Sequence, residues 1–302
     1  MAYGGPDSLD DVEPYLLDVR GGRPTSPQLV EEIKERYARI GGKSPLLEIT
    51  RQQAQSLQQE LDRRVGDGLF RTYVGMRHWA PRIREAVEQI HDDGIRHIAA
   101  MVMAPHYSSM STEVYLERLR EAIGDLGGDI EVTAIRSWHD HPGLVAAIAG
   151  NARQTIDRFE GSSPFVLFSA HSLPSRILAR GDPYADQLNQ TAQLVAQELN
   201  LPGDRWSFCF QSAGRTQEPW LGPSIEAEIP RLVELGEKNI LVTPVGFVAD
   251  HVEVLYDVDI EAAGLVSQAG ARLERTPSLN ASPAFISALA SIILDHLDLS
   301  NR

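Results

Sequence analysis

The stretch PFVLFSAHSLP, residues 164–174, joins an apolar run to a polar end. Residues 165–168 are apolar and β-forming, which predicts a buried strand, and Pro174 prevents a direct continuation into a helix. His171 therefore stands at the carboxyl end of a core strand. A neutral imidazole can accept a proton or bind a metal. A lone histidine at a strand end is more often a hydrogen-bonded structural residue, so this position alone leaves both roles open.

Short apolar runs alternate with amphipathic segments along the whole chain. This alternation predicts right-handed crossovers and mostly parallel sheets covered on both faces. We expect an α/β fold with two similar doubly wound lobes, 1–150 and 151–302, a cleft between them, and a last helix able to pack back on the first lobe. The predicted strands cover 69–76, 97–105, 130–135, 164–170, 205–211 and 239–247, and the predicted helices lie near 27–40, 50–65, 81–93, 111–126, 143–159, 185–200, 223–236, 251–265 and 282–297.

Polar residues gather where the predicted strands end, which is where parallel sheets bind ligands. The segments MAPHYSSMS, SAHSLP, FQSAGR and PVGFVADHVE each follow a strand. No strand is followed by G-x-G-x-x-G, and G-x-x-x-x-G-K-[ST] is missing, so nucleotide binding has no support.

Composition narrows the class of protein. The net charge of −14 argues against nucleic acid as a partner, because phosphate binding needs a basic face. No apolar run approaches the roughly 18 residues that a membrane span requires, and the N-terminus lacks the features of a signal peptide, so we expect a cytoplasmic protein. The single cysteine, Cys209, excludes an internal disulfide and an all-cysteine iron–sulfur cluster within one chain, and its apolar surroundings predict a buried thiol.

The first residues, MAYGGP, read as the exit of a strand whose body is missing from the sequence. We therefore expect Met1 to be an internal methionine of a longer natural chain. A missing strand would put in doubt how firmly Tyr3 is held.

A row of carboxylates occupies the segment ADHVEVLYDVDIEA (249–262). Glu253, Asp257 and Glu261 follow one another at intervals of four, so on an α-helix they fall within an arc of about 80°. Asp250 and Glu253 also have the spacing of a capping box, and helix capping alone would explain both residues without a further function. No cap requires the two later carboxylates, and oxygens in a row could pass a cation along a groove.

Basic and aromatic residues supply candidate ligand contacts. Arginine forks bind carboxylates in a bidentate manner, although Arg36 could simply pair with Glu32 four residues earlier. Flat side chains near loop ends suit a flat apolar ligand. The basic candidates are Arg20, Arg23, Arg36 and Lys43, and the aromatic and hydroxyl candidates are Tyr3, Ser44, Tyr107, Tyr115, Trp220 and Phe247.

Together, SAHSLP, FQSAGR…PWLGP and PVGFVADHVEVLYDVDIE strongly resemble the motifs of ferrochelatases, which insert ferrous iron into porphyrins. The resemblance runs from AYGGP through IGGKSPL and APHYSS to the last helix. The tyrosine of MAYGGP and the absence of an apolar lip are similar to the soluble branch that acts on coproporphyrin III.

The resemblance implies roles for individual residues. His171 corresponds to the active-site histidine and Glu253 to its partner from the opposite wall of the cleft, together binding the incoming iron. Asp257 and Glu261 correspond to an outer metal site with Arg36 nearby, and Tyr3 to an axial ligand of the product iron. The positions that contact the porphyrin or its propionates are Tyr3, Arg20, Arg36, Tyr37, Ser44 and Tyr115.

The implied chemistry is consistent with these residue types. A porphyrin loses two N–H protons when it takes up a metal, so the site needs a group that binds metal or accepts a proton and a carboxylate that stabilises charge. The expected partners are the porphyrin and ferrous iron, with no further cofactor and with a transient handover of product to the next enzyme of haem biosynthesis.

The sequence leaves three other functions open and disfavours a fourth. The substrate could be protoporphyrin IX, or the chain could be a sirohydrochlorin chelatase, although eight substrate carboxylates would demand more cationic residues. A non-catalytic porphyrin or haem carrier would need Tyr3 or His171 but not the acidic row. A serine hydrolase is disfavoured because no G-x-S-x-G elbow is present.

Overall fold

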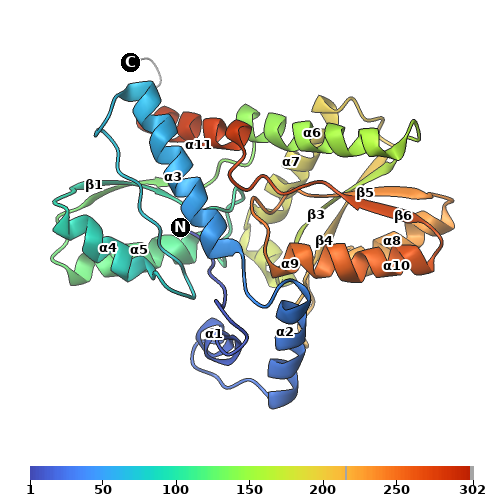
Figure 1. Cartoon of the computed structure of the whole chain (residues 1–302), viewed down its shortest axis with the longest axis horizontal. Helices are drawn as coiled ribbons and strands as arrows, with labels where there is room; N and C mark the ends of the chain where they lie inside the picture. Colours follow the sequence, from blue (N-terminus) through green and yellow to red (C-terminus); the bar gives the residue numbers. More distant parts are fainter. Residues whose placement is uncertain (215, 300–302) are drawn as a thin grey trace.

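The computed structural model describes residues 1–214 and 216–299, which form two parallel sheets surrounded by helices (Figure 1). The N-terminal sheet pairs β1 with β2, and the C-terminal sheet has the order β4-β3-β5-β6. All of these strand pairs are parallel. The strands are β1 (His97–Met101), β2 (Glu131–Ile135), β3 (Phe165–His171), β4 (Trp206–Gln211), β5 (Asn239–Pro244) and β6 (Arg272–Arg275).

The helices begin and end where local sequence signals favour it. Ser26 caps α2 by accepting from the Leu29 amide, and Pro27 takes the first helical position. The helices are α1 (Val12–Val19), α2 (Pro27–Arg39), α3 (Leu46–Val65), α4 (Ile83–Asp92), α5 (Thr112–Asp125), α6 (Pro142–Ile156), α7 (Tyr184–Glu198), α8 (Ile225–Glu234), α9 (Val252–Leu255), α10 (Ala263–Gln268) and α11 (Pro283–His296), with short helices η1 (Asp157–Phe159), η2 (Ser175–Arg180) and η3 (Asp257–Ala262).

The predicted α/β fold with parallel sheets is confirmed, but the strand predicted at 69–76 is wrong. Met76 makes only isolated bridges, with Ala2 and Arg82, and an apolar cavity of about 500 Å³ separates 69–75 from β1. A β-rich segment becomes a strand only where a neighbouring backbone pairs with it. The N-terminal sheet therefore has two described strands against four in the C-terminal sheet, which makes the lobes less similar than expected.

The first three residues are nevertheless firmly held. The Met1 ammonium donates to the Met101 carbonyl at 2.7 Å, and the Arg77 amide donates to the Ala2 carbonyl at 2.9 Å. The His78 amide donates to the Tyr3 carbonyl, also at 2.9 Å. These bonds fix the backbone of Tyr3 against the segment that follows Met76.

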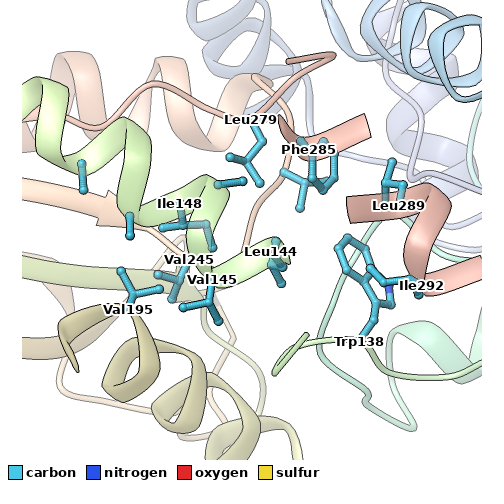
Figure 2. Packing of buried hydrophobic residues seen from close by; sticks show 14 of the residues in the cluster. Trp138, Leu144, Val145, Ile148, Val195, Val245, Leu279, Phe285, Leu289 and Ile292 are labelled. Atoms are coloured by element: carbon cyan, nitrogen blue, oxygen red, sulfur yellow. The ribbon is translucent and has the colours of Figure 1, made fainter. Parts of the chain in front are cut away.

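One apolar core crosses from the first half of the chain to the second (Figure 2). Trp138 stacks on Phe285 of α11, with 6.0 Å between ring centroids, and both belong to the cluster that also contains Phe168 of β3. Helix α11 packs on α3 and α6, so the last helix does contact the first lobe (Figure 1). The domain boundary near residue 150 stays a prediction, and α6 runs through it without a break.

Within the described ranges, no helix combines the length and the apolar character needed to cross a membrane.

Candidate active site

His171 and Glu253 meet at the carboxyl edge of the C-terminal sheet. His171 ends β3, and Glu253 lies on α9, shortly after the neighbouring strand β5. Its Oε1 atom lies 3.5 Å from Nε2 of His171. The two side chains were expected on opposite walls of a cleft, whereas the structure places them after neighbouring strands of one sheet. Their closeness follows from the pairing of β3 with β5, which brings the two strand ends together.

Neighbouring groups fix both side chains. The Nδ1–H of His171 donates to the Ser172 carbonyl, which directs Nε2 toward the carboxylate. Gln211 on β4 is paired in register with His171, and its amide donates to the Glu253 carbonyl at 2.7 Å. The Tyr184 hydroxyl donates to the His171 carbonyl at 2.9 Å. Three strands and the start of α7 therefore hold the pair in place.

The two groups shift each other's protonation. Burial lowers the pKa of His171, but the Glu253 carboxylate and the Ser172 carbonyl outweigh it and raise that pKa to about 9. Burial likewise opposes ionisation of Glu253, but His171 and His251 hold its pKa below the usual range. Both shifts favour an imidazolium beside a carboxylate, and a protonated Nε2 must lose its proton before it can donate to a metal.

These desolvated side chains still touch solvent. The exposed fractions are 29% for the His171 side chain and 31% for that of Glu253. Because both side chains are partly exposed, a ligand can reach them. The 500 Å³ cavity of the first lobe is a separate feature, because none of its lining residues is a candidate site residue.

The carboxylate row continues from α9 into η3, which is a π-helix rather than an α-helix. The Glu261 amide bonds the Tyr256 carbonyl at 3.0 Å, five residues back. In ideal geometry a four-residue step advances by about 40° in an α-helix and turns back by about 30° in a π-helix with roughly 4.4 residues per turn. The two steps nearly cancel, so Glu253, Asp257 and Glu261 align better than the 80° arc of a continuous α-helix would allow.

Asp257 is the most perturbed carboxylate of the row after Glu253. Burial raises its pKa to about 6, the Glu253 charge adds to the shift, and the Ser212 hydroxyl and Arg36 oppose it. Ser212 has a left-handed backbone (φ 58°), and its hydroxyl bonds the Asp257 carboxylate.

Arg36 joins the first lobe to this row. Its guanidinium lies 3.2 Å from the Asp257 carboxylate and 3.4 Å from that of Glu261. It also contacts Glu32 at 3.4 Å, so the pairing within α2 occurs together with the contacts to the row. The structure therefore brings Arg36 to the outer carboxylates, as the resemblance implied.

Of the three tyrosines predicted to contact porphyrin, Tyr37 and Tyr115 are buried, whereas Tyr3 is 39% exposed. Burial raises the pKa of Tyr3 to about 12, and the charge of Glu253 adds to the shift. The same two causes raise the pKa of Tyr37, and that of Tyr115 is raised in the same way, chiefly by burial. The Glu253 charge thus contributes to the shift of all three tyrosines.

The other two residues predicted to contact the porphyrin, Ser44 and Arg20, differ from each other in burial. Ser44 is buried, and a Cβ on Gly5 would come within 2.5 Å of its Oγ, so the second glycine of AYGGP permits the close approach. Arg20 ends α1 in an exposed position, and within the described ranges its guanidinium makes no hydrogen bond or ion pair. Its role in porphyrin binding stays a prediction.

Sequence reasoning missed several residues that shape the site. Gln211, Ser212 and His251 all lie inside motifs singled out above, which was the available signal, whereas nothing marked Tyr184. Among the aromatic candidates, Trp220 lies 6.4 Å from the His171 ring and Phe247 lies 4.6 Å from the His251 ring.

His171 and Glu253 together suit a metal ion that takes its remaining ligands from outside the protein. In the part of the chain that the structure describes, no three His, Cys, Asp or Glu side chains gather to hold an ion. His171 and Glu253 offer one nitrogen and one oxygen, and iron accepts both ligand types. Cys209 is buried, as predicted, and burial raises the pKa of its thiol.

Comparison with known proteins gives first the class and then the family. The fold is that of chelatases: SirB from Bacillus subtilis with Fe3+ superimposes with a TM-score of 0.59 at 13% identity, covering 83% of this chain and 91% of SirB. CbiX, described as the terminal enzyme of siroheme biosynthesis in denitrifying bacteria, gives 0.54 at 16% identity, covering 83% and 93%. These likenesses show the fold alone.

The chain belongs to the ferrochelatase family, whose model matches residues 1–297. A ferrochelatase of Deinococcus radiodurans is 45% identical over 97% of this chain and 93% of its own length. Coproporphyrin III ferrochelatases of Geobacillus sp. (strain WCH70) and Bacillus subtilis are 41% and 39% identical, over 99% and 98% of this chain and 97% and 96% of their own. The family resemblance predicted from the motifs is confirmed.

Proposed function

We propose that this metal chelatase inserts ferrous iron into coproporphyrin III and releases Fe-coproporphyrin III, or coproheme. The contact of 3.5 Å between the partly exposed His171 and Glu253 side chains carries the proposal. The names of the Geobacillus and Bacillus subtilis relatives support this porphyrin, whereas the Deinococcus relative is named only ferrochelatase.

The pair can perform the two tasks of insertion. Iron must exchange its water for porphyrin nitrogens, and two pyrrole protons must leave the ring. His171 and Glu253 can each bind the incoming ion through one atom, and either can accept a proton once it is free. Binding energy from contacts with the rest of the porphyrin is needed to bend the macrocycle and expose its lone pairs.

Other residues take supporting roles in this proposal. Asp257 and Glu261 form an outer iron site, and Tyr3 is the axial ligand of the product iron. Arg20, Arg36, Tyr37, Ser44 and Tyr115 contact the porphyrin or its propionates. The lack of an iron–sulfur cluster or other cofactor, the cytoplasmic location and the handover of product stay predictions.

The test is anaerobic incubation of the purified chain with Fe²⁺ and one porphyrin at a time, followed by the absorbance change of metallation. We expect coproporphyrin III to be metallated faster than protoporphyrin IX, and sirohydrochlorin not at all. Equal or faster metallation of protoporphyrin IX would contradict the substrate. Binding of coproporphyrin III without metallation of any porphyrin would favour a carrier.

A further inference from the structure

Arg77 is a cation of the N-terminal half that has no anionic partner among the described residues. In the described ranges its guanidinium makes no hydrogen bond and no ion pair, and its buried Nε has no acceptor. A half-buried charge without a partner is costly, and native proteins rarely keep one unless something binds to it. The chain carries a net charge of −14, so it contains enough carboxylates for one of them to pair with Arg77.

The guanidinium lies between two of the candidate tyrosines. Its central carbon is 5.8 Å from the ring centroid of Tyr3 and 5.3 Å from that of Tyr115. The Arg77 amide bonds the Ala2 carbonyl, so the backbones of Arg77 and Tyr3 are held side by side. The backbone contacts that place Tyr3 therefore also set the position of Arg77 and the surroundings of its side chain.

A second cation adds to the charge at this point. Arg118 on α5 donates from its guanidinium to the Arg77 carbonyl. Burial raises the pKa of Tyr3 and of Tyr115, and both arginines oppose it. Two positive charges thus act on the two rings that the Glu253 charge also reaches.

Arg77 differs from the arginines considered so far either in its partners or in its burial. The fork of Arg36 already contacts three carboxylates, including Asp257, and Arg20 is exposed at the end of α1. Helix α2, which carries Arg36, and helix α5, which carries Arg118, lie in different parts of the first lobe (Figure 1). Arg36 on α2, and Arg77 with Arg118 of α5, therefore form two separate groups of cations in the N-terminal half of the chain.

We propose that Arg77, assisted by Arg118, binds one carboxylate of the porphyrin and favours a tetracarboxylate porphyrin over a dicarboxylate one; this rests on the function proposed above. A porphyrin with two propionates carries them on neighbouring pyrroles and can satisfy one group of cations. Coproporphyrin III carries a propionate on every pyrrole, so it can reach both groups at once. The planar guanidinium fork suits bidentate binding of a carboxylate.

The test measures porphyrin binding without metal, by quenching of protein fluorescence, in the full chain and in Arg77→Gln and Arg77→Lys. Arg77→Gln should raise the Kd of coproporphyrin III by about ten- to a hundredfold and that of protoporphyrin IX by less than about threefold. Arg77→Lys, which keeps the charge but loses the fork, should fall between. The matched control is Arg84→Gln, which removes an exposed arginine paired with Asp125 and should leave both Kd values unchanged.

A Kd for coproporphyrin III within about twofold of the original in Arg77→Gln overturns the proposal, as does equal weakening of both porphyrins. Should Arg77→Gln fail to fold, Arg118→Gln answers the same question: selective weakening of coproporphyrin III supports the anchor, and no change overturns it. Binding without metal is independent of catalysis. An original chain that binds but metallates neither porphyrin would contradict the proposed function and leave the anchor standing.

Discussion

Asp257 follows Glu253 in the carboxylate row, and the Arg36 guanidinium lies 3.2 Å from its carboxylate. If it helps to attract iron, its removal should matter most when iron is scarce. Asp257→Ala should raise the KM for Fe²⁺ by about three- to tenfold with little change in kcat, because steering acts on encounter rather than on chemistry. The rate is measured against Fe²⁺ concentration. Asp259→Ala, which removes a carboxylate of the same helix that pairs with Arg275, is the control. An equal effect of both changes would exclude a special role.

His106 gives a test of acid stability. Burial lowers its pKa to about 3, and its Nε2 contacts the Thr191 hydroxyl across the two halves of the chain. The imidazole takes up a proton near pH 6.5 in the unfolded state but only near pH 3 in the folded state. The contribution of neutral His106 to the stability of the fold is therefore complete above pH 6.5 and is lost as the pH falls. The free energy of unfolding should drop by about 1.4 kcal/mol per pH unit below that point. Urea titrations at several pH values should show a shallower drop in His106→Gln, and an unchanged slope would refute the assignment.

At the level of single residues, the motifs were enough to predict His171 and Glu253 as partners. They could not show that both come from one sheet edge, because that depends on which strands pair. The role of Gln211 could not be predicted either, because its contact with the Glu253 backbone exists only where β4 lies in register with β3.

Gly246 controls how closely the segment after β5 approaches β3. A Cβ at this position would lie 2.5 Å from the Ala170 Cβ, so the segment leading to Glu253 would have to move. Gly246→Ala should destabilise the fold by about 1–3 kcal/mol and slow iron insertion. Denaturation and metallation assays check both effects.

Gly264→Ala is the matched control, because nothing lies within 4 Å of a Cβ on that α10 glycine. It should be stabilising by about 0.5–1 kcal/mol, since alanine favours a helix. Similar losses in both variants would show that the approach to Ala170 is not what matters.

The helices were predicted more completely than the strands. Each predicted helix has a counterpart, because apolar periodicity and capping are local. The segment 69–76 has strand composition but lacks a paired neighbour, and β6, with the sequence RLER, is a strand only because β5 lies beside it. The π-helix could not be foreseen either, since the spacing of its carboxylates also fits an α-helix.

The two sheets share one core, so the molecule should unfold as a unit. Phe285 of α11 is fully buried and stacks on Trp138. Phe285→Ala should cost about 3–5 kcal/mol, and a single transition should remain, with fluorescence and circular dichroism curves coinciding. Leu235→Ala, at a position 68% exposed, should change stability by less than about 0.5 kcal/mol. Two separated transitions would show that the lobes are independent.

The central claim is that the His171–Glu253 pair performs metal insertion and does not merely hold a porphyrin. The most direct measurement compares Glu253→Gln with Glu261→Gln, which removes the same charge at the outer end of the row. With coproporphyrin III and saturating Fe²⁺ under anaerobic conditions, Glu253→Gln should lose at least about a hundredfold in rate while its Kd for the porphyrin stays within about threefold. Glu261→Gln should keep most of the rate. Near-normal insertion by Glu253→Gln would contradict the account.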